Sequence, residues 1–258
     1  VPYNPPEELS LSAVSQALAC PCQFLLGTVL ALQNLPEPTA GLPPTERGFL
    51  LHKILELFTR RLARELAEYQ TWDDDRVWEI LLEVIAAHPE LFRRDLHWEA
   101  EVARWLDPEV GLLPAWLAAE GERFRDGWRW LEMEASFSGL QLPGLPFRLR
   151  GRLDRLDWHP QKGLMVWDYK TGSLPKAASF RAEARHIQLP GGVLAVRQGL
   201  IPLPKSVQGA KVRAGFIGLK SKRRDHLKFE DYQLAGEDWE AILAERLQQL
   251  FFLAARLQ

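Results

Sequence analysis

Two aspartates and a lysine lie close together in the second half of the chain. Asp154 is in the segment GRLDRLD, and Asp168 and Lys170 are in VWDYKTG. Side chains alternate between the two faces of a β-strand, so Asp168 and Lys170 would share one face and Tyr169 would point to the other. The segment HPQKG at 159–163 is rich in residues that favour turns. The pattern therefore predicts a β-hairpin that carries these side chains.

The turn also predicts which residues of the two strands face each other. Asp154 and Asp168 are equidistant from Gln161 along the chain, so their Cβ atoms would lie about 4.5–5.5 Å apart. Two carboxylates this close repel each other unless a cation lies between them, and oxygen ligands suit Mg²⁺ or Mn²⁺. A lysine beside such a metal can orient a water and offset charge during phosphoryl transfer. The alternative is a surface hairpin in which Lys170 forms an ordinary salt bridge with an aspartate.

The rest of the chain supplies elements that could position this hairpin. After an extended lead-in over residues 1–9, apolar residues recur at helical spacing from Ser10, the expected helix cap together with Ser12 as an alternative. The helical pattern continues through RGFLLHKILELFTRRLARELAEY and through two or three segments between 72 and 121. Period-two strands begin near residue 127, and further strands are expected near 214–219 and 227–233, with helices over 178–199 and 237–258.

This order predicts an α/β fold. We expect a helical N-terminal part over 1–126 and an α/β core over 127–258, which together form one structural domain. The first residue is Val rather than Met, from which we expect a domain cut from a longer protein.

Composition narrows the classes of protein to consider. The chain has 258 residues and a formal net charge of −2, so positive charge for binding nucleic acid must be local. No apolar run is long enough to span a membrane, and the first residues have neither the basic nor the apolar region expected of a signal peptide. Cys20 and Cys22 are typical of reduced thiols, so we expect a cytoplasmic protein that does not contact a membrane.

The motifs together resemble those of the RecB-type nucleases in the PD-(D/E)XK superfamily. GRLDRLD and VWDYKTG are similar to the two central motifs of that family, and RGFLLHKILELF is similar to an upstream helix that supplies a histidine. LSLSAVSQALACPCQFLL resembles the N-terminal segment of the family, and HIQLPGGVLAV resembles the helix after the lysine. These segments occur in the family's order over residues 9–198. The resemblance implies a restriction-endonuclease-like core, in which helices flank a central mixed sheet.

The resemblance also implies a role for individual residues. His52, Asp154, Asp168 and the backbone carbonyl of Tyr169 would bind Mg²⁺ or Mn²⁺, and both aspartates would belong to the catalytic set. Lys170 would be the catalytic lysine. The alternative for His52 is a histidine on a helix face with its polar atoms already satisfied.

Two further residues have implied catalytic roles. Glu134, in LEMEASF, would reach the metal through water, or else would be a solvated strand residue. Gln188 would form hydrogen bonds near the active centre or to DNA. The chain departs from the family at Gly192, where a tyrosine is common. The pair Gly191–Gly192 also weakens a helix by about 1 kcal/mol per glycine, which brings a DNA contact by this helix into question.

A basic segment offers a binding site for nucleic acid. Between Arg197 and Lys228 there are nine lysines or arginines and a single acid. Neutralised phosphates raise affinity in a salt-dependent way. We therefore expect contacts to DNA from the densest part of the segment, which contains Lys220, Lys222, Arg223 and Arg224. The alternative is a solvated loop.

Some members of the family hold a [4Fe–4S] cluster with one upstream cysteine and three near the C-terminus. Cys20 matches the upstream position, but no cysteine follows Cys22. We therefore expect no iron–sulfur cluster.

The function implied by the resemblance is a Mg²⁺- or Mn²⁺-dependent deoxyribonuclease, exonuclease or endonuclease, in DNA repair or recombination. The alternative is a catalytically silent DNA-binding or scaffolding module on the same fold. Related domains often end helicase-like proteins, so the expected partners are DNA and a helicase or helicase-like region of the same parent protein. A metalloenzyme acting on a small molecule has no pocket signature in the sequence.

Overall fold

The computed structural model describes residues 7–32, 43–91, 96–142, 147–175, 187–219 and 228–231, and in addition 241, 243–245 and 247. The strands are β1 (Glu8–Ser10), β2 (Arg129–Leu140), β3 (Arg148–His159), β4 (Gly163–Lys170), β5 (Val212–Gly218) and β6 (Lys228–Asp231).

The helices are α1 (Leu11–Ala19), α2 (Pro21–Phe24), α3 (Pro44–Tyr69), α4 (Asp74–Ala87), α5 (Leu96–Leu106), α6 (Leu112–Asp126) and α8 (Gln188–Arg197). Shorter helical turns cover Leu25–Val29, Pro89–Leu91 and Lys205–Val207. The predicted helix over 178–199 is observed as α8, and its first half lies outside the described residues. The described residues of the predicted closing helix are helical.

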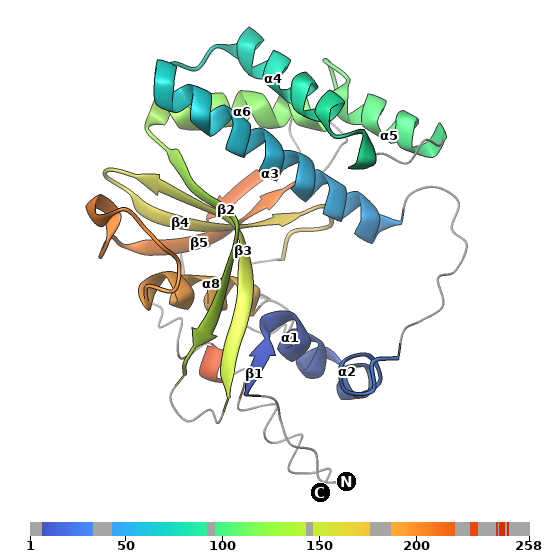
Figure 1. Ribbon diagram of the computed structural model, residues 1–258, viewed down its shortest axis with the longest axis vertical. Coiled ribbons are helices and arrows are strands. Elements are labelled where there is room, and N and C mark those ends of the chain that lie inside the picture. Colours follow the sequence, from blue (N-terminus) through green and yellow to red (C-terminus); the bar gives the residue numbers. More distant parts are fainter. Residues whose placement is uncertain are drawn as a thin grey trace, which may run out of the picture.

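The strands form one mixed sheet with helices on both faces. Its order is β1-β3-β4-β5-β6, and β2 pairs with β3 off this path. Figure 1 shows α3 to α6 gathered as a layer above the sheet, while α1 and α8 lie on its other side. The predicted α/β class, a mixed sheet flanked by helices with a helical N-terminal part, is therefore confirmed.

Each helical layer has its own apolar cluster against the sheet. Leu11 and Val14 of α1 and Val193 of α8 pack on residues of β3, β4 and β5. On the other side, residues of α3 to α6, such as Phe58 and Trp116, pack against β2, β4 and β5. Within the described residues, no helix is long and apolar enough to cross a membrane.

The N-terminal residues belong to the sheet. The expected lead-in is extended, but its end forms β1, which pairs in parallel with β3 from Glu8–Arg148 to Ser10–Arg150. Ser10 then begins α1, because its Oγ accepts a hydrogen bond from the Ala13 N–H (3.1 Å). The prediction of Ser10 as the cap is confirmed, and a local sequence pattern could not reveal the pairing of β1.

The two glycines of α8 permit close packing of this helix. A Cβ atom at Gly191 would lie 2.4 Å from Leu11 Cδ1, and one at Gly192 would lie 2.5 Å from Leu153 Cδ2. No side chain fits at either position without displacing its neighbour. The glycine at 192 is therefore explained by the contact of α8 with β3, since a tyrosine there would have no room.

Candidate metal centre

The central hairpin has the register that the turn predicted. β3 and β4 pair antiparallel from Arg155–Trp167 to His159–Gly163. One further step in the same register places Asp154 opposite Asp168, at the end of the paired region. The Oδ2 atom of Asp154 accepts a hydrogen bond from the backbone N–H of Tyr169 (2.9 Å). This contact fixes the Asp154 carboxylate at the open end of the hairpin, where the pairing of β3 with β4 ends.

Helix α3 brings His52 to this end of the hairpin. Its Nδ1 atom lies 3.3 Å from Glu134 Oε1 and 3.7 Å from Asp154 Oδ2. The imidazole also makes an edge-on contact with the ring of Tyr169, with centroids 5.3 Å apart. His52 thus contacts two carboxylates that are far from it in the sequence.

Glu134 is held in an unusual backbone conformation in the middle of β2. Its φ of 51° lies in the left-handed region, which is uncommon for a residue other than glycine. Its side chain is 7% exposed, and Oε2 lies 2.8 Å from Arg152 Nε while Oε1 contacts His52. The alternative of a solvated strand residue is therefore wrong for Glu134.

These three residues form a group that could hold a metal ion. One ligand atom each from His52, Glu134 and Asp154 lies within 4.8 Å of the others. Two carboxylates and an imidazole are ligands that divalent cations such as Mn²⁺ accept. The donor set therefore fits the kind of metal that the family resemblance implies.

Asp168 has a different partner. Its Oδ2 atom lies 2.5 Å from Lys170 Nζ, and its side chain is nearly buried. Lys170 Nζ also lies 5.5 Å from the centroid of the Phe216 ring. The salt bridge that was the alternative to a metal site is thus present between these two residues. Asp168 lies outside the group of three ligand atoms, and its role as a ligand stays a prediction, as does that of the Tyr169 carbonyl.

The electrostatics of the group favour bound protons when no cation is present. Burial, together with the charge of Asp168, raises the pKa of Asp154 to about 7, against the opposing effects of His52 and of the hydrogen bond from Tyr169. Burial alone would lower the pKa of His52, but its hydrogen bond to Glu134 and the charge of Asp154 raise the pKa overall. A divalent cation entering the site would therefore displace protons.

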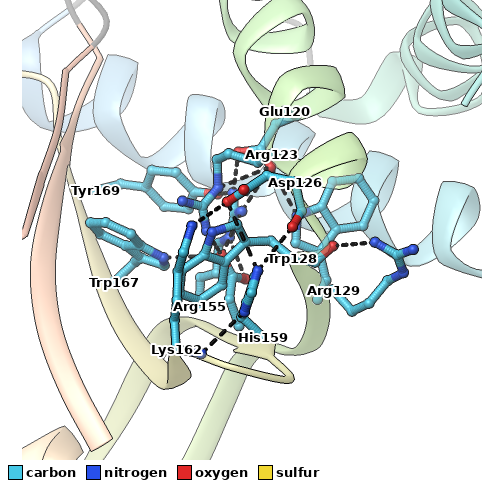
Figure 2. Close-up of polar contacts among 12 residues, drawn as sticks. Glu120, Arg123, Asp126, Trp128, Arg129, Arg155, His159, Lys162, Trp167 and Tyr169 are labelled. Carbon is cyan, nitrogen blue, oxygen red and sulfur yellow. Dashed lines mark hydrogen bonds and ion pairs between the residues drawn. The ribbon is translucent and has the colours of Figure 1, made fainter.

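Behind the hairpin lies a buried ionic network that the sequence analysis missed (Figure 2). Arg155 is 0% exposed and bonds to Glu120 through Nη1 and Nη2 (2.5 and 2.8 Å) and to Asp157 through Nε and Nη2 (2.8 Å each). Its Nη1 also lies 3.2 Å from the Tyr169 hydroxyl. Arg123 completes the network by donating to Asp157 (2.6 Å).

This network ties α6 to the two strands that carry the candidate site. Tyr169 connects directly to it, so the network supports the strand between Asp168 and Lys170. The signal in the sequence is weak: Arg155 and Asp157 are two positions apart, in a strand that carries several other charged residues. Such charges remain buried only when they are paired.

The other predicted residues lie away from this group or outside the described residues. Gln188 is the first residue of α8, and its Nε2 lies 3.4 Å from Ser12 Oγ in α1. Its role at the active centre or on DNA stays a prediction. The four basic residues Lys220, Lys222, Arg223 and Arg224 lie outside the described residues. Cys20 and Cys22 are exposed free thiols.

Comparison with known families agrees with the fold. The sequence profile of the PD-(D/E)XK nuclease superfamily matches residues 8–258. The chain belongs to the PD-(D/E)XK nuclease superfamily.

Two solved structures resemble the chain more distantly. One is a protein provisionally named an exonuclease, from Eubacterium rectale, which is 12% identical with a TM-score of 0.41 and matches 97% of this chain and 79% of its own. The other is a protein named SSO0001, 13% identical with a TM-score of 0.31, over 93% of this chain and 84% of its own. At these TM-scores neither likeness carries an argument about function. The curated proteins contain no match to the chain.

Proposed function

We propose that this chain is a divalent-metal-dependent DNA nuclease of the RecB type that acts in DNA repair or recombination. The convergence of His52, Glu134 and Asp154 beside Asp168 and Lys170 is the observation that carries the proposal. Membership of the nuclease superfamily supports the same reaction. The RecB type and the biological process rest on the resemblance of the motifs.

In this proposal the metal is Mg²⁺ or Mn²⁺. His52, Glu134 and Asp154 would hold it, with Asp168 and the Tyr169 carbonyl as further ligands. A divalent cation bound there polarises a phosphodiester and lowers the pKa of a bound water. No iron–sulfur cluster is part of the proposal, because no cysteine follows Cys22 in the sequence.

Each of these residues would have a separate role at this centre. His52 and the carboxylates would hold the cation in place. Lys170 supplies a positive charge beside Asp168, where it can orient the attacking water and offset the negative charge of the transition state. The buried Arg155 keeps the strand that carries Asp168 and Lys170 in place through its contact with Tyr169.

A helicase-like region of the same parent protein and a cytoplasmic location also belong to this proposal. The helicase partner rests on the resemblance to RecB-type proteins, and the location on the free thiols of Cys20 and Cys22. Neither is needed for the chemistry at the metal centre.

The experiment that tests the proposal is a cleavage assay on purified protein first stripped of metal with EDTA. End-labelled single-stranded DNA, linear duplex and closed circular duplex are incubated with Mg²⁺, Mn²⁺ or EDTA. We expect cleavage only with a divalent metal and none in the Asp154→Asn variant. The closed circle separates endonuclease from exonuclease. DNA binding without cleavage under every metal condition would instead support the catalytically silent module.

A further inference from the structure

The first half of β3 carries a row of arginines on one face. Arg148, Arg150 and Arg152 are exposed, whereas Leu149 and Leu153, whose side chains point to the opposite face, are buried in the apolar cluster beneath α1 and α8. Residues two apart on a strand are about 6.6 Å apart and share a face. The row therefore leads along the strand and ends two residues before Asp154.

Polar residues of the neighbouring strands accompany this face. Ser136 of β2 pairs with Arg152, and both Ser136 and Ser138 are exposed. On the other side, Ser10 of β1 pairs with Arg150. The arginines are thus not covered by apolar side chains of β2 or β1, and a ligand can approach them.

The charges of the row are only partly neutralised within the protein. Arg148 lies 3.8 Å from Glu7, whose side chain is 94% exposed, and a surface pair of this kind contributes at most about 1 kcal/mol. Arg150 has no ion pair within the part of the chain that the structure describes. Arg152 contacts Glu134 through Nε, but 59% of its side chain remains exposed. Glu134 is itself a candidate metal ligand, so a cation would weaken its hold on Arg152.

One more acid lies near the start of the row. Glu8 pairs with Arg148 across β1 and β3, but its Oε1 accepts a hydrogen bond from the backbone N–H of Gly139 (2.7 Å). Arg148 and Arg152 thus each have an acid nearby, Glu7 and Glu134, whereas Arg150 has no ion pair with any described residue. Arg150 therefore contributes most to the positive potential of the face.

Arginines of the helical layer differ from this row. Arg76 is surrounded by Glu65, Glu79 and Glu83, each within 3.2 Å. Arg104 pairs with Glu101 in the same way (3.0 Å). The net charge of the chain is −2. The row on β3 is therefore a local concentration of positive charge beside the candidate metal centre.

We propose that the row Arg148, Arg150 and Arg152 is the track on which the phosphodiester backbone of one DNA strand lies as it enters the metal centre. The proposal rests on the proposed nuclease function and adds a binding surface to it. An arginine offers donors in a planar fork that fits two oxygens of a phosphate. The row runs along β3 towards Asp154, so a DNA backbone bound to it would lead to the metal centre.

The test measures how DNA binding depends on salt in the full chain. Fluorescence anisotropy is measured with labelled single-stranded and duplex oligonucleotides, in EDTA to prevent cleavage. It gives Kd at salt concentrations from roughly 50 to 300 mM, over which phosphate contacts make the affinity fall steeply. Each lost phosphate contact reduces the slope of log K against log salt by about 0.7 for single strands and about 0.9 for duplex DNA. For Arg148→Gln/Arg150→Gln we expect weaker binding and a slope that is smaller by roughly 1.4 on single strands.

The matched control removes two exposed arginines from the helical layer. Arg104→Gln/Arg125→Gln changes the net charge equally, at side chains that are also mainly exposed, and its slope should equal that of the parent. Arg148→Lys/Arg150→Lys keeps both charges and should keep the slope. Far-ultraviolet circular dichroism and a thermal melt check that each variant is folded.

The outcomes separate this surface from the nuclease function itself. A reduced slope in the β3 glutamine variant alone supports the track. Equal reductions in both glutamine variants, or none in either, overturn it. If the parent cleaves DNA while the β3 variant keeps the parental slope, the track is wrong and the nuclease proposal stands. If the parent binds through the row and never cleaves, the track stands and the nuclease proposal fails.

Discussion

The protonation of Asp154 decides how readily the centre takes up a cation. Its carboxylate lies 3.7 Å from His52 Nδ1 and accepts a hydrogen bond from Tyr169. Burial and the nearby Asp168 nevertheless raise the pKa of Asp154 to about 7. In the metal-free protein a raised carboxyl pKa stabilises the fold at acid pH, and this contribution is lost as the pH rises from the ordinary 3.8 through about 7.

Metal binding should therefore depend on pH in a defined direction. Below about 7 a cation must displace the proton of Asp154, so the apparent affinity for Mn²⁺ should rise with pH up to that region and level off above it. Calorimetric titrations at a series of pH values, repeated in two buffers with different ionisation enthalpies, measure the affinity and the protons released. An affinity that does not change between acid and neutral pH would contradict this account of Asp154.

Metal binding and catalysis should separate at Asp168 and Lys170. Lys170 is not a metal ligand in this account, so Lys170→Ala should keep Mn²⁺ binding. The cleavage rate should fall by about 10²–10³, the usual effect of losing one preorganised electrostatic contact. Asp168→Ala should weaken Mn²⁺ binding and abolish cleavage together. Calorimetry is run beside the cleavage assay on both variants. If Lys170→Ala cleaves at the parental rate, the lysine is only a salt-bridge partner.

At the scale of elements, the buried network couples α6 to the hairpin. Arg155→Met would leave the buried Glu120 and Asp157 with less compensation. The free energy of unfolding should fall by about 3–5 kcal/mol, as is typical when one partner of a buried ion pair is removed. Arg125→Met is the control, because its pair with Asp74 is exposed and should contribute at most about 1 kcal/mol. Urea unfolding measures both, and similar small losses would show that the network is not a structural anchor.

The close contact of α8 with β3 makes a second prediction about elements. Alanine normally stabilises a helix relative to glycine by about 1 kcal/mol. Gly192→Ala should instead destabilise by about 1–3 kcal/mol, the usual effect of overpacking, because its Cβ would lie 2.5 Å from Leu153 Cδ2. Gly172→Ala, where a Cβ meets nothing within 4 Å, is the control. A Gly192→Ala protein with a raised melting temperature would contradict the packing explanation.

The sequence predicted those features that depend on local patterns. The turn at 159–163 was enough to predict the pairing of β3 with β4, because both strands leave it without a bulge. Period and capping were enough to place α1 after Ser10. His52 was placed in the site by resemblance alone, since no local pattern connects α3 with the hairpin.

Features that depend on tertiary packing were not predicted. Glu134 contacts His52 from a backbone with a positive φ, which the alternating pattern of the strand does not predict. From the sequence alone, Arg155 and Glu120 would be expected at the surface. Only the packing of α6 on the sheet brings them together in the interior. The arginine row was also missed, because its meaning depends on which face of β3 remains exposed.

At the scale of the whole molecule, one sheet joins two helical layers at the candidate centre. Helix α3 packs against β2, so the helix contributes His52 while β2 contributes Glu134 and β3 contributes Asp154. The central claim is that these three side chains from separate elements bind one divalent cation. Asp168 and Lys170 then complete the centre from β4.

The most direct test is pulsed electron paramagnetic resonance on the Mn²⁺-loaded protein with ¹⁵N-labelled histidine. The account predicts one bound Mn²⁺ with a hyperfine coupling to a directly coordinated histidine nitrogen. This coupling should vanish in His52→Gln and persist in His97→Gln, a control at an exposed histidine of α5. Mn²⁺ that binds without any nitrogen coupling, or a coupling that survives in His52→Gln, would contradict the claim.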